Sequence, residues 1–243
     1  MGGDALFIAD LHLTAARPAI TRIFFRFMEE TAPDAAALYV LGDLFEYWIG
    51  DDDLPDPFNA EVAAAFRRLG DSGVGTSFLV GNRDFLLAKE FENASGGKIL
   101  PDPTQLMLFG VQTVITHGDT LCTDDAEYAE TYRTVRSPAW QAELLRQPRD
   151  TRHALARGYR ERSELGKQEK SPEIMDANAD AIAALFREYR CPRLIHGHTH
   201  RPGRFLHAVD GRECERWVLP AWYEGGGYLR CNAEGCALIA LAT

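Results

Sequence analysis

Short apolar runs that end in polar residues recur along the first two hundred positions of this chain. Residues 5–10 read ALFIAD, residues 37–43 read ALYVLGD, and residues 75–84 read GTSFLVGNRD. Residues 113–119, TVITHGD, and residues 192–198, PRLIHGH, repeat the arrangement. Apolar runs of this length predict buried β-strands. Each strand is therefore expected to end in Gly, Asp, Asn or His.

Helices are expected in the gaps between these strands. Residues 19–32 place apolar side chains at helical spacing, with Arg22, Arg26 and Glu29 on another face. Residues 60–73 form a second helical pattern that ends in glycine. Strands alternating with helices predict an α/β fold with a largely buried sheet. Ligands of such sheets bind at the carboxyl ends of the strands, where the polar residues fall.

The remaining segments suggest two further parts of one domain, residues 1–243. After residue 200, the segments RWVLPAW, GYLRC and CALIALA look like β-meanders separated by glycine turns and predict a second sheet. From about 124 to 190 the pattern is helical, which indicates an insertion. Within it, residues 146–170 carry eight Arg or Lys against four Asp or Glu, a net charge of +4. This run is either a solvated helix face or a cap that binds anions.

Composition narrows the classes of function. The formal net charge of the 243 residues is −10, which argues against a nucleic-acid partner and suits carboxylates gathered around divalent cations. The five cysteines form no CxxC pair, so we expect thiols in a reducing compartment and no disulfide framework. The N-terminal stretch lacks the features of a signal peptide, and no run approaches the roughly 18 apolar residues of a membrane span. We expect a cytoplasmic protein that can touch a membrane surface.

The polar strand ends together offer the side chains of a metal site. In chain order they read DLH (10–12), GD (42–43), GNRD (81–84), HGD (117–119) and GHTH (197–200). Divalent Mn, Fe or Zn accepts imidazole and carboxylate ligands, and two adjacent ions need a carboxylate that bridges them. The glycines at 42, 81 and 197 allow the backbone to approach closely. The candidate metal ligands are Asp10, His12, Asp43, Asn82, His117, His198 and His200.

This set of motifs resembles the calcineurin-like metallophosphoesterase superfamily, whose pattern is D-x-H, GD, GN(H/R)(D/E), a later His and GHxH. The resemblance spans residues 10–200 and implies a four-layer α/β/β/α sandwich with a helical insertion capping the active site. It implies one metal ion on Asp10, His12, Asp43 and His200. It implies a second ion on Asp43, Asn82, His117 and His198, with Asp43 as the bridge. A water shared by the two cations would attack phosphorus, with Asp43, His117 and Arg83 as catalytic residues.

Arg83 departs from the commonest form of this pattern, in which histidine follows GN and acts as a general acid. Arginine cannot donate a proton at neutral pH, but it can hold a phosphate with two parallel hydrogen bonds. A phosphate monoester leaves without needing a proton, because its second pKa is near 6. Arg83 therefore favours cleavage of a pyrophosphate over cleavage of a simple ester.

Longer stretches resemble one branch of the superfamily, the UDP-2,3-diacylglucosamine pyrophosphatases. They are GDLFEYWIGDDD (42–53), GNRDFL (81–86), SPEIMDAN (171–178) and HGHTHRP (196–202). The resemblance implies two Mn²⁺ ions and hydrolysis of UDP-2,3-diacylglucosamine to UMP and 2,3-diacylglucosamine 1-phosphate (lipid X) in lipid A biosynthesis. It implies a peripheral protein on the cytoplasmic face of the inner membrane. We predict no protein partner. The implied substrate-binding residues are Asn82, Arg83, Asp125, Tyr128, Ser163, Lys167, Lys170 and His198.

Other interpretations stay open at this point. A generic calcineurin-like phosphodiesterase would act on cyclic nucleotides or soluble esters, against which Arg83 and the basic insertion argue. A metal-free binding scaffold should have lost ligands, whereas all seven are present. A nuclease is disfavoured by the acidic charge. His196 either orients a metal ligand or is a hydrogen-bonded core residue, while His153 and His207 are expected at the surface.

Overall fold

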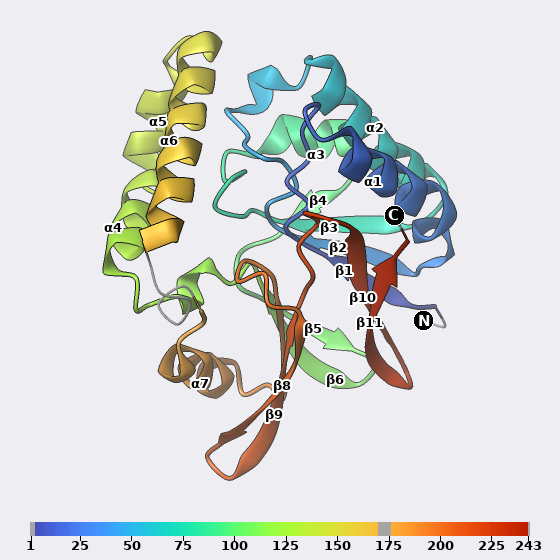
Figure 1. Cartoon of the computed structure of the whole chain (residues 1–243). Coiled ribbons are helices and arrows are strands. Elements are labelled where there is room, and N and C mark those ends of the chain that lie inside the picture. Colours follow the sequence, from blue (N-terminus) through green and yellow to red (C-terminus); the bar gives the residue numbers. More distant parts are fainter. Residues whose placement is uncertain (1–2, 170–175, 243) are drawn as a thin grey trace.

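Two β-sheets lie face to face in the computed structural model, which describes residues 3–169 and 176–242 (Figure 1). The strands are β1 (Ala5–Ile8), β2 (Ala37–Leu41), β3 (Gly75–Leu79), β4 (Lys98–Ile99), β5 (Thr104–Leu108), β6 (Val111–Thr116), β7 (Arg193–His196), β8 (Gly203–Val209), β9 (Arg212–Val218), β10 (Gly226–Asn232) and β11 (Gly235–Leu241). The first sheet has the order β11-β10-β1-β2-β3-β4, and the second has the order β5-β6-β7-β9-β8. The neighbouring strands β1, β2, β3 and β4 run parallel, and so do β6, β7 and β9.

Helices cover the outer faces of both sheets. The described α-helices are α1 (Pro18–Glu30), α2 (Pro57–Asp71), α3 (Lys89–Ser95), α4 (Ala126–Val135), α5 (Pro138–Leu145), α6 (Arg149–Glu169) and α7 (Ala179–Tyr189). α1, α2 and α3 pack on the first sheet, and α7 packs on the second, which gives the expected four layers (Figure 1). α4, α5 and α6 lie together to one side of the sheets (Figure 1). Within the described residues, no helix has both the length and the apolar character required to span a bilayer.

Strand β1 is apolar throughout because both of its faces are buried. In β1, Leu6 and Ile8 point into the core beneath α1 and α2, whereas Ala5 and Phe7 point into the core between the sheets. Alternate residues of a strand face opposite sides, so every side chain of β1 meets one of these two cores. The first polar residue of this segment, Asp10, comes only after β1 has ended.

The expected grouping of the strands was wrong in one respect. The segments after residue 200 do not form a sheet of their own. β8 and β9 join β6 and β7, while β10 pairs antiparallel with β1 and carries β11 at the edge of the first sheet. Apolar patterning reports how many faces of a strand are buried, but it carries no information about which strand is the neighbour. The elements α3, β4, β5 and β8 were not anticipated.

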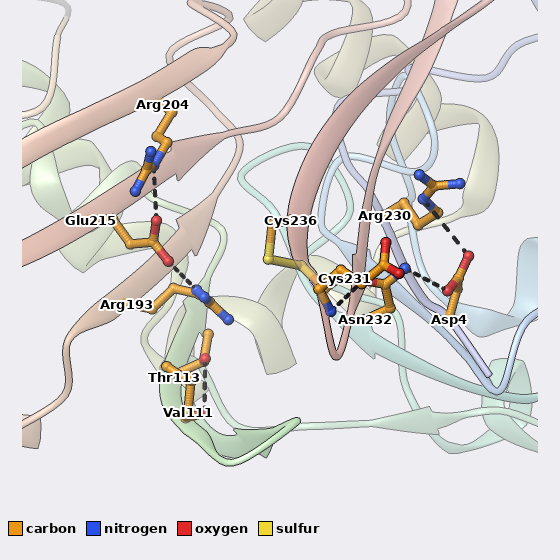
Figure 2. Close-up of a disulfide and its surroundings, with 11 residues drawn as sticks. Asp4, Val111, Thr113, Arg193, Arg204, Glu215, Arg230, Cys231, Asn232 and Cys236 are labelled. Carbon is orange, nitrogen blue, oxygen red and sulfur yellow. Dashed lines mark hydrogen bonds and ion pairs between the residues drawn. A yellow bond between two sulfur atoms is a disulfide. The ribbon is translucent and has the colours of Figure 1, made fainter. Parts of the chain in front are cut away.

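A disulfide joins Cys231 to Cys236, contrary to the expectation of free thiols (Figure 2). The two residues are direct cross-strand partners of the β10–β11 hairpin, with their Cα atoms 4.1 Å apart. The hairpin register brings the two side chains together, and this pairing cannot be read from cysteine spacing alone. The other cysteines, Cys122, Cys191 and Cys214, are buried thiols.

Phe78 at the end of β3 offers a test of the core beneath α2 and α3. Its ring is fully buried, 4.9 Å from that of Phe66 and 5.2 Å from that of Phe91 between centroids. Phe78→Ala should lower the free energy of unfolding by about 3–5 kcal/mol, measured by chemical denaturation, because it leaves a cavity among aromatic rings. Met107→Ala is the control, since Met107 is 63% exposed and should change stability by about 0.5 kcal/mol or less. Equal losses in the two variants would contradict this description of the core.

Candidate metal centre

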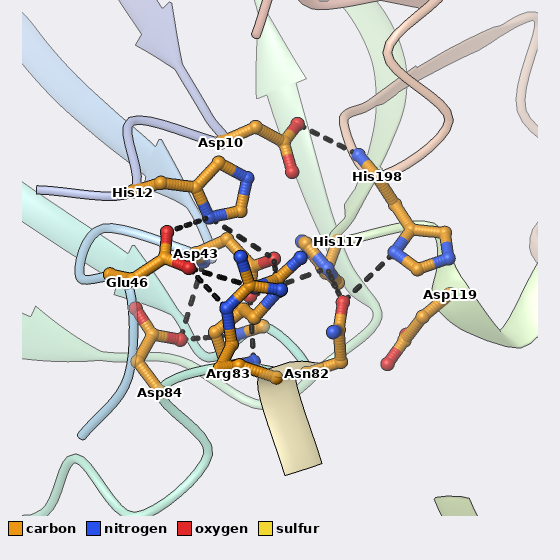
Figure 3. A network of polar contacts seen from close by, with 12 residues as sticks. Asp10, His12, Asp43, Glu46, Asn82, Arg83, Asp84, His117, Asp119 and His198 are labelled. Carbon is orange, nitrogen blue, oxygen red and sulfur yellow. Dashed lines mark hydrogen bonds and ion pairs between the residues drawn. The ribbon is translucent and has the colours of Figure 1, made fainter. Parts of the chain in front are cut away.

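The loops that follow β1, β2, β3, β6 and β7 meet at one edge of the two sheets (Figure 3). They bring the seven predicted ligands into one cluster. Within it, potential ligand atoms of Asp10, His12 and His200 lie within 4.8 Å of one another, as do those of Asp10, Asp43 and His117. Asp10 belongs to both groups. Parallel strands direct their carboxyl ends to the same edge, so residues from distant parts of the sequence converge here.

Asn82 connects the remaining histidine to the cluster. Its Oδ1 atom lies 3.1 Å from His117 Nε2 and 3.0 Å from His198 Nδ1. His117 Nδ1 lies 2.8 Å from the backbone oxygen of Leu41, to which it must donate because a carbonyl only accepts. Nδ1 therefore carries a proton, and Nε2 faces the cluster. Metal-binding histidines are commonly oriented by such a bond from their other nitrogen.

Asp43 lies between the two sets of histidines. Its Oδ2 atom is 3.9 Å from His12 Nδ1, and its Oδ1 atom is 3.8 Å from His117 Nε2. Asp10 also faces in two directions, since its Oδ1 lies 3.4 Å from His200 Nε2 and its Oδ2 accepts a hydrogen bond from the His198 N–H. Each carboxylate thus offers oxygens to two sides, which is the arrangement that a pair of neighbouring cations requires.

The backbone of the cluster is held in an unfavourable conformation. Five of the predicted ligands have left-handed φ angles, namely Asp10 (55°), His12 (49°), Asp43 (51°), His198 (65°) and His200 (55°). Residues with a β-carbon adopt this region rarely, and the strain persists only where surrounding structure enforces it. These tight turns bring the side chains of the five residues together at the ends of the strands.

The predicted close approach of the glycines is confirmed. A Cβ atom on Gly81 would overlap Asp43 Oδ1, and one on Gly197 would overlap Asp10 Oδ2. A Cβ on Gly42 would lie only 2.6 Å from His117 Nδ1. Only glycine therefore fits at these three positions as long as Asp10, Asp43 and His117 stay where they are.

Asp84 has a structural role that the sequence pattern did not reveal. Its side chain is fully buried and accepts hydrogen bonds from the N–H groups of Gly81 and Leu44, both at 2.7 Å, and of Asp43 at 3.3 Å. It therefore joins the loop after β2 to the loop after β3. The only signal available beforehand was its place at the end of the GNRD motif.

The electrostatics of the cluster call for added positive charge. Burial raises the pKa of the Asp43 carboxyl to about 7. Burial lowers the pKa of His117, but the carboxylates of Asp43, Asp119 and Asp10 outweigh it and raise that pKa to about 9. The site therefore retains a proton on His117 that a divalent cation can replace, and metal binding commonly releases protons in this way. The nitrogen and oxygen donors present fit such an ion.

The helical segment contacts the cluster through Tyr128 and Arg136. The Tyr128 hydroxyl donates to Asp119 Oδ2 at 3.3 Å, and its ring centroid lies 5.6 Å from that of His198. Arg136 donates to the backbone oxygen of Gly81 at 2.9 Å. Asp125 caps α4 by accepting from the Tyr128 N–H at 3.0 Å, and this cap fixes the start of the helix.

The other predicted substrate residues differ in how well they can be placed. Ser163 is exposed on α6, and within the described residues it makes no hydrogen bond to the cluster. Lys167 lies on α6 with a side chain outside those described, and Lys170 lies outside the described residues altogether. These three assignments therefore stay predictions. Arg83, by contrast, lies in the cluster, with its Nε atom 3.7 Å from Asp43 Oδ2.

The three remaining histidines have structural partners. His196 is fully buried, with Nδ1 2.8 Å from the Gly197 oxygen and Nε2 3.2 Å from an Arg216 nitrogen, and burial lowers its pKa to about 4. It is a hydrogen-bonded core residue, the second of the two alternatives. The other two, which were expected at the surface, are partly exposed and partly buried. His153 contacts Asp53 at 3.2 Å, and His207 accepts from Arg216 at 3.2 Å.

Comparison with known proteins agrees with this geometry. Residues 4–202 match the family described as calcineurin-like phosphoesterase. The chain is 49% identical to a UDP-2,3-diacylglucosamine hydrolase of Aromatoleum aromaticum over 96% of this chain and 94% of that protein. It is 46% identical to a protein of the same name from Edwardsiella ictaluri, over 97% of this chain and 91% of that one. A Thermotoga maritima protein solved by NMR shares the fold, at 12% identity and a TM-score of 0.50 over 99% of each chain.

Gly81→Ala tests whether the cluster binds metal in the observed geometry. The added methyl group would displace the Asp43 carboxylate, so the affinity for Mn²⁺ should fall by about 10-fold or more, measured by calorimetric titration of the metal-free protein. Gly70→Ala is the matched control, because Gly70 lies in α2 with no atom within 4 Å of an added Cβ. Unchanged affinity in Gly81→Ala would exclude Asp43 from the binding site.

Proposed function

Because this chain belongs to the calcineurin-like phosphoesterase family, we propose that it hydrolyses the pyrophosphate bond of UDP-2,3-diacylglucosamine. The products would be UMP and 2,3-diacylglucosamine 1-phosphate, an intermediate of lipid A biosynthesis. The observation that carries this proposal is identity of 44–49% to proteins named UDP-2,3-diacylglucosamine hydrolase over nearly the whole length of both chains. The cluster at the strand ends supports it, since all seven ligand residues lie together.

Two divalent ions, for which we propose Mn²⁺, would be held by this cluster. Asp10, His12, Asp43 and His200 would hold the first ion. Asp43, Asn82, His117 and His198 would hold the second, with Asp43 as the bridge. Such ions supply a nucleophile by lowering the pKa of water and neutralise phosphate charge. The hydrogen bond to the Leu41 oxygen fixes the ring of His117, so its Nε2 atom is oriented before any ligand arrives.

Arg83 would bind the diphosphate beside these ions. Its backbone N–H donates to Asp43 Oδ1 at 2.8 Å, which ties the position of Arg83 to that of the bridging carboxylate. Its guanidinium group can donate two parallel hydrogen bonds to phosphate oxygens and compensates their charge. Loss of a phosphate monoester needs no protonation, so a residue that only stabilises charge is sufficient here.

The helical insertion, residues 124–190, would cap the site and bind the remainder of the substrate. Three arginines fasten it to loops of the cluster edge: Arg136 to Gly81, Arg152 to Ile49 and Asp52, and Arg160 to Glu46. Asp125, Tyr128, Ser163, Lys167 and Lys170 are the substrate-binding residues proposed on this insertion.

Apolar side chains on the same insertion fit the acyl chains of the substrate. Leu155 and Tyr159 on α6 are 41% and 44% exposed, and Leu145 at the end of α5 is 46% exposed. With the basic run 146–170, they also offer a surface for anionic lipid headgroups. On this basis we propose peripheral attachment to the cytoplasmic face of the inner membrane.

The direct test is UMP release from UDP-2,3-diacylglucosamine with Mn²⁺, followed by chromatography. Asp43→Ala should lower kcat by about 100-fold or more, because it would remove the carboxylate that faces both sets of histidines. UDP-glucosamine without acyl chains should be a much poorer substrate, since remote binding energy helps to place the reacting centre. Failure of the metal-loaded protein to release UMP, with turnover of a soluble phosphodiester, would indicate a generic phosphodiesterase instead.

Variants of Arg83 test the proposed diphosphate contact. Arg83→Ala should lose about 10²-fold in kcat/KM, equivalent to about 2.7 kcal/mol of transition-state binding. Arg83→Lys should recover only part of this loss, because an ammonium group cannot form the paired hydrogen bonds. Arg83→His should not restore pyrophosphate cleavage. It should increase the hydrolysis of an aryl phosphodiester, because a protonated imidazole can donate a proton to the leaving oxygen. A histidine variant as active as the wild type on the pyrophosphate would refute the contact.

A further inference from the structure

Glu46 occupies a position that neither the ligand set nor the substrate residues include. Its backbone N–H donates to the Leu13 oxygen at 3.0 Å, beside the loop that carries Asp10 and His12. Phe45 before it and Trp48 after it are buried in the core beneath α3. The backbone of Glu46 is therefore fixed, and its side chain reaches into the cluster (Figure 3).

One carboxylate of Glu46 contacts three separate segments of the chain. Oε1 accepts from Arg83 at 3.2 Å and from Arg160 of α6, and Oε2 lies 3.8 Å from His12 Nδ1. The side chain is 17% exposed. Two guanidinium groups, one from the loop after β3 and one from the helical segment, thus meet at the same oxygen.

Two arginines that share one carboxylate are restricted in both position and direction. Guanidinium groups repel each other, so without an anion between them they would separate. Arg83 Nε also lies 3.7 Å from Asp43 Oδ2. Glu46 thereby offers Arg83 a partner other than the proposed bridging ligand, which leaves the oxygens of Asp43 directed at the histidines.

We propose that Glu46 is a positioning residue, which holds Arg83 and Arg160 side by side so that both guanidinium groups are directed at the substrate diphosphate. This inference rests on the proposed function. Glu46 would not touch phosphate itself, because two anions repel. It would instead remove the cost of bringing two flexible cationic side chains together when the diphosphate binds.

The chain contains a matched control for this residue. Glu215 on β9 also binds two arginines, Arg193 and Arg204 at 2.9 Å, and its side chain is 16% exposed (Figure 2). It lies on the second sheet, outside the cluster. Replacement of Glu215 removes a carboxylate of similar exposure that also binds two arginines, one on each oxygen, without changing the candidate site.

The test compares E46A, E46Q and E215A with the wild type on UDP-2,3-diacylglucosamine. E46A should lower kcat/KM by about 10- to 100-fold while the bound Mn²⁺ per chain stays unchanged, and E46Q should lose less because it keeps an accepting oxygen. E215A should stay within twofold of the wild type. In a chain that also carries R83A and R160A, E46A should cost almost nothing further, because its effect acts through the arginines.

Several results would overturn this role. They are activity within twofold of the wild type in both Glu46 variants, an equal loss in E215A, a loss of activity that follows a loss of Mn²⁺, or a full effect of E46A in the chain without the arginines. A wild type that releases no UMP would refute the proposed function alone. Glu46 is then tested by calorimetric binding of inorganic pyrophosphate to the Mn²⁺-loaded protein. E46A should weaken this binding about tenfold, and equal affinity would exclude the positioning role.

Discussion

The contact between the loops after β2 and β3 is the constraint on which the rest of the site depends. The Gly81 backbone passes so close to Asp43 that there is no room for a Cβ atom at position 81. The buried carboxylate of Asp84 binds N–H groups from both loops and holds them at this distance. The position of Asp43 between the two sets of histidines follows from that contact.

The arrangement is costly for the metal-free protein. It gathers buried carboxylates, which burial destabilises in their charged form, and it places five ligand residues in left-handed backbone conformations. The core beneath α1 and α2 and the core between the sheets supply the stability that maintains this strain. Because the candidate ligands already lie together, little reorganisation would be needed for them to bind cations.

Three arginines of the helical segment form hydrogen bonds to the loops around the cluster. Arg136 and Arg160 reach residues of the loops that hold the ligands, and Arg152 is buried against the segment that follows Glu46. A guanidinium group keeps its charge at every relevant pH and forms several directed hydrogen bonds. The property that lets these side chains fasten the helical segment to the loops of the cluster is the same one that suits a guanidinium group to anionic phosphate.

The sequence by itself determined the class of fold, the ends of five strands and the seven candidate ligand residues that meet at one edge. Each is encoded in a short stretch, because a strand with two buried faces is mainly apolar and a run of Gly and polar residues follows it. The sequence also indicated Arg83 and the glycines, since each follows from its place within a short motif.

Only the tertiary structure decided which sheet each strand joined, how Cys231 meets Cys236, and what Asp84 and Glu46 do. These depend on partners that the local pattern cannot identify. Glu46 binds Arg160, 114 positions later in the chain, and Asp84 binds the N–H of Leu44, 40 positions before it. Strand order and hydrogen bonding arise from packing across the whole chain, and a short window of sequence records the burial of a residue but not its neighbour.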